Sequence, residues 1–127
     1  MATTITGKTK TFKSAGDLEN KQNYVVYVNA KGIVTIGSAA THALMGTVVN
    51  KPQAGIGANI EVMLPFGGGS GKVIAGGSIS IGSKLTSDSA GKAVATTSAG
   101  NFVFGIAIEP ADTNDVFEYM PHYEKHA

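Results

Sequence analysis

Residues 24–36 read Tyr-Val-Val-Tyr-Val-Asn-Ala-Lys-Gly-Ile-Val-Thr-Ile. The first five of these residues are β-branched or aromatic, a composition typical of strands. The Asn-Ala-Lys-Gly that follows has the chemistry of a turn, and Ile33 to Ile36 is again rich in β-branched residues. The segment therefore predicts two short strands joined by a turn, and with them a β protein.

Similar runs continue along the chain, each followed by a turn or by a breaking residue. They recur about every 8–12 residues, the spacing of a β-barrel or sandwich. No window keeps an apolar period of about 3.6 residues, and residues 38–44 offer one helical turn at most. We therefore expect an all-β fold, a small single-domain barrel or sandwich built from short antiparallel strands. The further predicted strands are residues 44–49, 60–64, 72–74, 78–81, 84–86, 93–97, 102–108 and 116–120.

The chain also shows an internal repeat. Gly32 lies in a turn beside a lysine, and Gly46 follows it inside an apolar strand; Gly91 and Gly105 repeat this arrangement at the same distance from each other. Each apolar strand leads to a turn containing proline and alanine, and then to an alternating strand with one glutamate. Two similar β units explain the pattern, and a glycine inside a strand marks a bulge or a close backbone approach. The alternative is chance similarity in a chain with 17 glycines.

The length of 127 residues corresponds to one domain that is large enough to bury a core. Its start differs in composition: residues 1–13 are rich in Thr and Lys, with Ile5 and Phe12 as isolated apolar residues. This segment fits either an edge strand or an arm that becomes ordered on a partner. We assign residues 1–20 to an extended N-terminal arm and residues 21–127 to a single β domain.

The composition excludes several classes of protein. The chain has no Cys, which excludes a disulfide scaffold, a thiolate metal site and a Cys nucleophile. The net charge is only +1 and all basic residues are Lys, which argues against a nucleic acid as partner. No apolar run approaches the roughly 20 residues of a membrane span, and no signal-peptide pattern opens the sequence. We therefore expect a product made inside a cell, with no membrane as partner.

The charges are unevenly distributed along the chain. The first quarter is basic and the final part is acidic. A solvated surface explains this, and so does complementarity between the start of one subunit and the end of another, or a larger partner. The basic residues are Lys8, Lys10, Lys13, Lys21 and Lys31, and the acidic ones are Glu109, Asp112, Asp115, Glu118 and Glu124.

The glycine-rich segment Gly67–Lys72 does not meet the requirements of a phosphate-binding loop. Such a loop needs a glycine at its first position and a Ser or Thr after the Lys. Phe66 and Val73 stand at these positions. We expect a flexible hairpin or a surface loop here.

No other constellation predicts chemistry. His122 and His126 lie in a polar segment where no stable helix is expected, so no zinc site is predicted. The acids of residues 109–115 lack the spacing of a calcium loop and fit a structural turn. Glu61 and Glu118 occupy matching places and fit exposed strand positions better than a carboxylate pair. With no Gly-x-Ser-x-Gly motif either, we expect no enzyme, no metal and no cofactor.

Several segments resemble a known family in their order and spacing. They are Tyr24–Val28, Ala30–Thr35, Met45–Val49, the Lys51–Gly55 turn, Ile60–Leu64, Val73–Leu85, Asp88–Val94 and Phe104–Ala111. Together, over about residues 20–120, they resemble the small capsid decoration, or cement, proteins of tailed bacteriophages.

This resemblance implies a β-rich structural protein, often a homotrimer, on the outer surface of the virion capsid. Such proteins bridge neighbouring major capsid proteins and stabilise the expanded shell against packaged DNA; this one would be made in the cytoplasm of the bacterial host. The arm is the expected contact with the shell or with an adjacent subunit, by strand addition. The residues assigned to this contact are Lys8, Lys10, Phe12 and Lys13.

Other functions stay open. An adhesin-like or carbohydrate-binding surface domain would use exposed Trp and Tyr, and this chain has no Trp and four Tyr. A small enzyme or ligand-binding barrel would need convergent polar residues. A lipoyl-type carrier would need a Lys at a hairpin tip, which the Glu61–Met63 strand does not supply.

Overall fold

In the computed structural model, which describes residues 9–66 and 69–126, every regular element is a β-strand. The first five strands form one antiparallel sheet in the order β1-β5-β4-β2-β3. They are β1 (Thr9–Lys13), β2 (Val25–Val28), β3 (Val34–Ile36), β4 (Met45–Val48) and β5 (Asn59–Met63).

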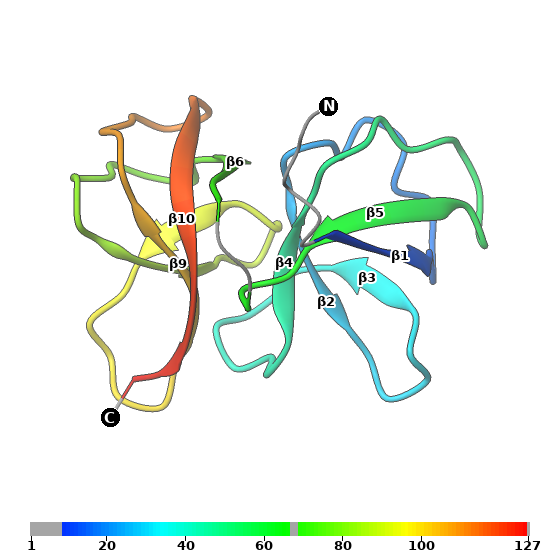
Figure 1. The fold of residues 1–127 in the computed structure, drawn as a ribbon, viewed down its shortest axis with the longest axis horizontal. Helices are drawn as coiled ribbons and strands as arrows, with labels where there is room; N and C mark the ends of the chain where they lie inside the picture. Colours follow the sequence, from blue (N-terminus) through cyan, green and yellow to red (C-terminus); the bar gives the residue numbers. More distant parts are fainter. Residues whose placement is uncertain (1–8, 67–68, 127) are drawn as a thin grey trace.

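The other five strands form a second antiparallel sheet in the order β6-β10-β9-β7-β8, which lies beside the first (Figure 1). The predicted all-β fold of short antiparallel strands is therefore confirmed. Within the described ranges, no helix is long and apolar enough to span a membrane. The strands are β6 (Gly71–Ile74), β7 (Lys84–Ser87), β8 (Ala93–Ala95), β9 (Phe102–Ala107) and β10 (Val116–Lys125).

The two sheets have the same topology. Matching β1–β5 in sequence with β6–β10 turns one strand order into the other, and equivalent strands pair in equivalent registers. We call β1–β5 the first repeat and β6–β10 the second repeat. The repeat that the glycine pattern predicts is thus present in the structure.

The turn between the second and third strands has the same hydrogen bonds in both repeats. Asn29 Oδ1 accepts hydrogen bonds from two main-chain N–H groups that follow it, at 2.9 and 3.3 Å. Asp88 Oδ1 does the same at 2.8 and 2.9 Å. Gly32 and Gly91 then take φ values of 77° and 79°, which glycine adopts at little cost.

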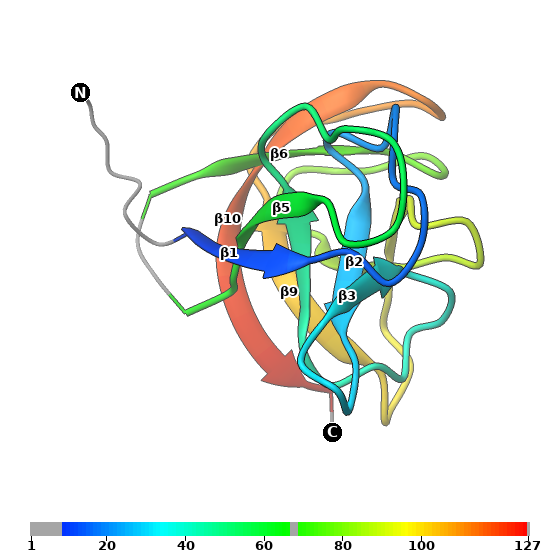
Figure 2. The ribbon, with the colours of Figure 1, turned by 90° about the vertical axis from the view of Figure 1, so that its right-hand side faces the viewer.

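Each sheet curls back on itself. Ser14, which follows β1, forms a parallel bridge with Val34 of β3, and Ala75, which follows β6, forms one with Ala93 of β8. Each repeat therefore approaches a small closed barrel (Figure 2), which hides part of its edge strands from solvent.

The core joins the repeats. One cluster of buried residues lies within the first repeat and includes Val26 and Ile60. A larger cluster combines second-repeat residues such as Phe104 with Met45 of the first repeat. Thr47 Oγ1 and the Tyr119 hydroxyl form a buried hydrogen bond of 2.6 Å between the repeats. Burial raises the pKa of the Tyr119 phenol well above its ordinary value, although the bond with Thr47 lowers it.

Three predicted elements differ from the structure. Residues 78–81 form no strand, because only Ile79 bridges, to Ala111. Residues 38–44 contain turns and no helix. β10 continues past Met120 to Lys125, because the main-chain groups of Pro121, which lacks an N–H, face away from β9, on the side where the pairing with β6 has ended at Tyr119.

Residues 9–20 lie against the first repeat. β1 pairs with β5 along its whole length, which is the edge-strand interpretation of this segment, and Leu18 is buried in the first repeat's core. Residues 1–8, the rest of the expected arm, lie outside the described residues. The division into an arm and a domain stays a prediction.

Candidate interaction surfaces

The residues predicted to contact a partner lie on β1, except Lys8, which is outside the described residues. Lys10 and Lys13 are exposed, and Phe12 packs against the first repeat's core. The Lys10 Nζ lies 5.7 Å from the centroid of the Phe12 ring, and the Lys13 Nζ donates a hydrogen bond of 2.7 Å to Asn59 Oδ1. The structure thus places these three side chains together on one edge strand, while their contact with a partner stays a prediction.

The outer side of β1 is an open strand edge. The Ser14 N–H donates to the Ala58 C=O (3.0 Å), so by antiparallel alternation the main-chain groups of Thr11 and Lys13 point away from β5. No backbone hydrogen bond within the described part of the chain reaches that side of β1. Such an edge is a template for an added strand.

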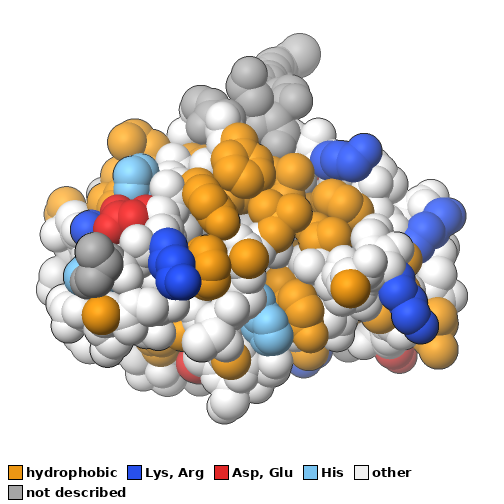
Figure 3. Space-filling model, turned by 90° about the horizontal axis from the view of Figure 1, so that it is seen from below, with side chains coloured by type: hydrophobic (Ala, Val, Ile, Leu, Met, Phe, Trp, Pro, Cys, Tyr) orange, Lys and Arg blue, Asp and Glu red, His pale blue; other side chains and the backbone are white. Residues whose placement is uncertain are grey.

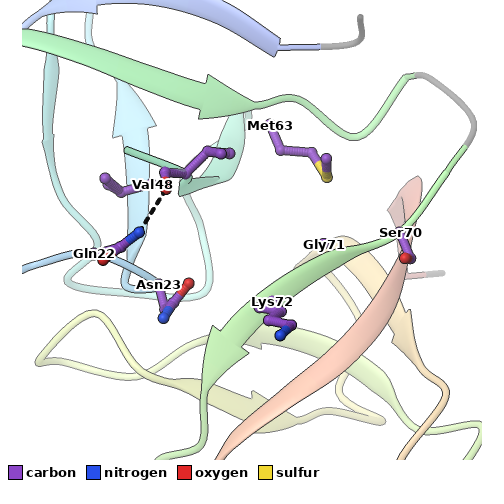
Figure 4. A pocket seen from close by; sticks show the side chains of 8 residues that line it. Gln22, Asn23, Val48, Met63, Ser70, Gly71 and Lys72 are labelled. Carbon is purple, nitrogen blue, oxygen red and sulfur yellow. Dashed lines mark hydrogen bonds between the residues drawn. The ribbon is translucent and has the colours of Figure 1, made fainter. Parts of the chain in front are cut away.

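A groove of about 400 Å³ separates the two repeats (Figure 4). The Gln22 side chain closes one end, where its Nε2 donates to the Val49 C=O (2.8 Å). A Cβ on Gly71 would lie 2.6 Å from Met63 Sδ, so β6 lies close against the Met63 side chain of the first repeat. The walls are Val48, Val49 and Met63 of the first repeat and Ser70, Gly71 and Lys72 of the second.

The edge of β6 faces this groove. The Ile74 N–H donates across the junction to the Asn23 C=O at 2.9 Å. Because main-chain groups alternate along a strand, those of Lys72 point the same way as those of Ile74. No backbone partner for Lys72 on that side occurs among the described residues. Part of the β6 edge is thus covered by the first repeat, and part is open to the groove.

Exposed aromatic side chains gather near the end of β10. The Phe66 side chain, 63% exposed, lies with its ring centroid 5.1 Å from that of Tyr123, which in turn is 6.2 Å from Phe102. Figure 3 shows hydrophobic side chains gathered on the face seen from below, where the chain ends in Figure 1. This cluster could not be predicted from the sequence, because three separate segments supply it and the alternation of Phe102 with Phe104 was the one signal.

The two matching glutamates are not a carboxylate pair. Thr9 Oγ1 donates to Glu61 Oε1 (2.9 Å) in the first repeat, and Ser70 Oγ donates to Glu118 Oε2 (2.7 Å) in the second. Each carboxylate therefore accepts a hydrogen bond from a hydroxyl in its own repeat, that of Thr9 in β1 or that of Ser70 just before β6. Over residues 9–66 and 69–126, no group of three or more His, Asp or Glu side chains is placed to hold a metal ion.

Glu124, near the end of β10, forms a cluster with Lys84 and His122. The Lys84 Nζ lies 2.8 Å from Glu124 Oε2, and the His122 Nε2 lies 2.9 Å from Glu124 Oε1. The hydrogen bond from Lys84, and then that from His122, hold the pKa of the Glu124 carboxyl below its ordinary value.

The remaining histidine of the sequence analysis, His42, stacks on Tyr27 with ring centroids 3.5 Å apart.

Comparison with known proteins gives a family for this arrangement. The model of the phage cement protein family matches residues 7–121, nearly the whole chain. The chain belongs to the phage cement protein family. The resemblance stated from sequence is thereby confirmed, and the cement protein is a protein associated with the phage capsid.

A solved structure from a bacteriophage head shares the fold of this cement protein. It is described as the head fiber gp8.5 N base in bacteriophage phi29, and it has a TM-score of 0.60 at 22% sequence identity. The match covers 93% of this chain and 98% of that chain. At this identity the likeness concerns the fold alone. No curated protein matches the chain significantly.

Proposed function

We propose that this cement protein binds the outside of the phage head as a homotrimer, bridges neighbouring major capsid proteins and stabilises the expanded shell. The observation that carries the proposal is the family match over residues 7–121. The fold supports a structural role, because the two repeats share a core and present open strand edges on their surface.

The mechanism rests on several weak contacts acting together. A trimer that bridges capsid proteins engages several sites at once, which raises the effective concentration for each further contact. Binding only the expanded shell stabilises that shell over other states by mass action. The N-terminal segment, with Lys10 and Lys13 on β1, is the proposed contact with the shell or with the adjacent subunit, by strand addition.

The test is co-sedimentation with expanded heads that lack the protein. Saturable binding at a fixed ratio to the major capsid protein is expected, and the decorated heads should survive heating better than bare heads. Absence of binding to both expanded and unexpanded heads would overturn the proposal. A glycan array then tests the adhesin alternative.

Deletion of residues 1–8 probes the proposed arm without touching β1. We expect weaker binding to heads and an unchanged unfolding midpoint, because β1 keeps its pairing with β5. A full-length variant with Lys10→Glu and Lys13→Glu separates the arm from the strand edge. Undiminished head binding by both proteins would remove the N-terminal segment from the contact.

A further inference from the structure

The two repeats dock on each other through different surfaces. Across their junction, the Ile74 N–H of β6 donates to the Asn23 C=O before β2. The equivalent positions in the opposite repeats are Lys13 and Gly82, which share no hydrogen bond in the described part of the chain. We call the outer edge of the first strand with its nearby glycine turn the edge surface, and the side that receives it the acceptor surface. A junction of this kind is head to tail.

The edge surface has a second example that none of the described residues covers. β1 is the equivalent of β6, and its outer side is open. The glycine turn between the second and third strands is likewise covered in the second repeat and exposed in the first. Gly91 is buried at the junction, where its C=O accepts a hydrogen bond of 2.7 Å from the Val25 N–H, whereas the equivalent Gly32 is exposed.

The acceptor surface also has a second example. In the second repeat, Met120 and Ile108 stand at the positions of Met63 and Val49, two of the groove-lining residues. Met63 is 4% exposed under β6, while Met120 is 51% exposed and Ile108 is 39% exposed. Ile81, beside the equivalent of Asn23, is 68% exposed. Three of the exposed large apolar side chains therefore lie on one face with no described partner.

The free surfaces carry charged residues at two positions where the covered surfaces carry uncharged ones. Gly71 on the covered edge is replaced by Lys10 on the free edge. Asn50, which follows the groove-lining Val49, is replaced by Glu109, which follows Ile108. This equivalence is secure, because both side chains accept a hydrogen bond from the main-chain N–H of the glutamate in the fifth strand, at 3.0 and 2.8 Å. Uncharged positions at the inner junction thus become a complementary pair where the surfaces are free.

We propose that the free edge surface of one copy binds the free acceptor surface of a second copy, in the head-to-tail arrangement that joins the repeats within the chain. The flexible end of the Met120 side chain turns aside for Lys10, which stands where the inner junction has Gly71. β1 of one copy then meets Ile108 and Met120 of the next, with Lys10 beside Glu109. Repetition of a head-to-tail contact closes into a ring when the rotation allows it. The inference rests on the homotrimer of the proposed function and assigns the surfaces that build it.

The first experiment compares masses in solution by sedimentation equilibrium. The wild-type protein is expected to form a discrete oligomer. The double variant Ile108→Glu/Met120→Glu places carboxylates in the contact, which raises the dissociation constant by roughly 100-fold and leaves monomers. Ile56→Glu is the matched control, because Ile56 is 81% exposed in a turn outside both surfaces. A wild-type monomer at every concentration, or an oligomer that survives the double variant, would overturn the proposal.

The second experiment uses charge reversal to test the pairing itself. Lys10→Glu and Glu109→Lys are each expected to dissociate the oligomer, while the chain carrying both substitutions regains it. In an equimolar mixture of the single variants, both contacts between unlike copies pair opposite charges, and only contacts between like copies are repulsive. A closed ring of three must place two copies of one variant side by side, so full rings should not form. Recovery of full rings in the mixture, or no recovery in the double variant, contradicts a head-to-tail contact between these residues.

Head binding is measured separately, so the two proposals fail in different ways. An oligomer with the expected variant behaviour that never binds heads refutes the capsid role and leaves this contact intact. A protein that decorates heads while its Ile108→Glu/Met120→Glu variant stays oligomeric refutes this contact and leaves the capsid role intact. Circular dichroism melting of every variant shows that each remains folded.

Discussion

At the residue scale, Gly46 and Gly105 occupy the same position in the two repeats. A Cβ on Gly46 would lie 2.5 Å from the Met63 carbonyl oxygen in the neighbouring strand. A Cβ on Gly105 would meet the ring of Tyr119. Both strands approach their neighbours more closely than any side chain allows, which is the meaning of a glycine inside an apolar strand.

Gly46→Ala should lower the free energy of unfolding by about 1–3 kcal/mol, because the added methyl group meets main-chain atoms that have nowhere to move. Urea denaturation measures the change. Gly77→Ala is the control: a Cβ there meets nothing within 4 Å, and the residue has no positive φ. A loss of stability in Gly77→Ala as large as that in Gly46→Ala would contradict the steric explanation.

The glycine spacing was visible in the sequence because a backbone contact needs that one residue type. The roles of Glu61 and Glu118 were visible only in part. Their matching places could be predicted, but their hydroxyl partners, Thr9 and Ser70, could not. A Ser or Thr that caps a carboxylate looks like any other surface hydroxyl in sequence.

At the element scale, the length of β10 could not be predicted from local sequence patterns. Alternation predicts its first half, and the proline at position 121 suggested an end. The strand continues because β6 pairs only with Val116–Tyr119 and leaves the second half of β10 as an edge, and the missing N–H of Pro121 faces that open side. Pairing partners decide the length of a strand, and they are set by tertiary structure.

The second half of β10 is also held by charge, which gives a prediction about pH. In Lys84→Met, the pKa of the Glu124 carboxyl should rise toward its ordinary value, because the largest cause of its lowering is removed. Carboxyl NMR titration of both proteins measures the difference. An identical pKa in both would exclude the 2.8 Å contact in solution.

The same shift fixes the direction of the pH effect. The pKa of Glu124 is lower in the folded state. Its contribution to the free energy of unfolding is therefore present above the ordinary carboxyl pKa and is lost as the pH falls through the lowered value. In Lys84→Met, the stability that is lost on acidification should be smaller than in the wild-type protein. Denaturation midpoints measured across this acidic range follow the loss.

At the scale of the whole molecule, the shared core couples the repeats. Met45 belongs to β4 of the first repeat and packs in the cluster that fills the second. The two sheets should therefore unfold in one transition, although each has a complete set of five strands.

Met45→Ala should cost about 2–5 kcal/mol and lower amide protection in both repeats equally. Hydrogen exchange at amides of β2 and β7 measures this. Ile60→Ala, buried in the first repeat's own cluster, provides the comparison and should act on the same single transition. Two separated transitions, or protection lost only in the first repeat, would show that the repeats fold independently.

The fold class, most strands and the duplication could be predicted, because periodicity and turn chemistry are local. The candidate surfaces could be predicted only as a basic start and an acidic end. That Lys10 lies on an open edge, or that Met120 is exposed where Met63 is covered, depends on which strands meet. No local pattern contains that information.

The tandem repeat has a consequence for symmetry matching. The ring of three chains proposed above, each with two repeats of the same topology, would approximate a six-fold object while being strictly three-fold. Such a ring can meet either a three-fold or a six-fold location on an icosahedral lattice with little mismatch. The five-fold vertices would be the positions it fits worst, and occupancy maps of decorated shells should show them empty.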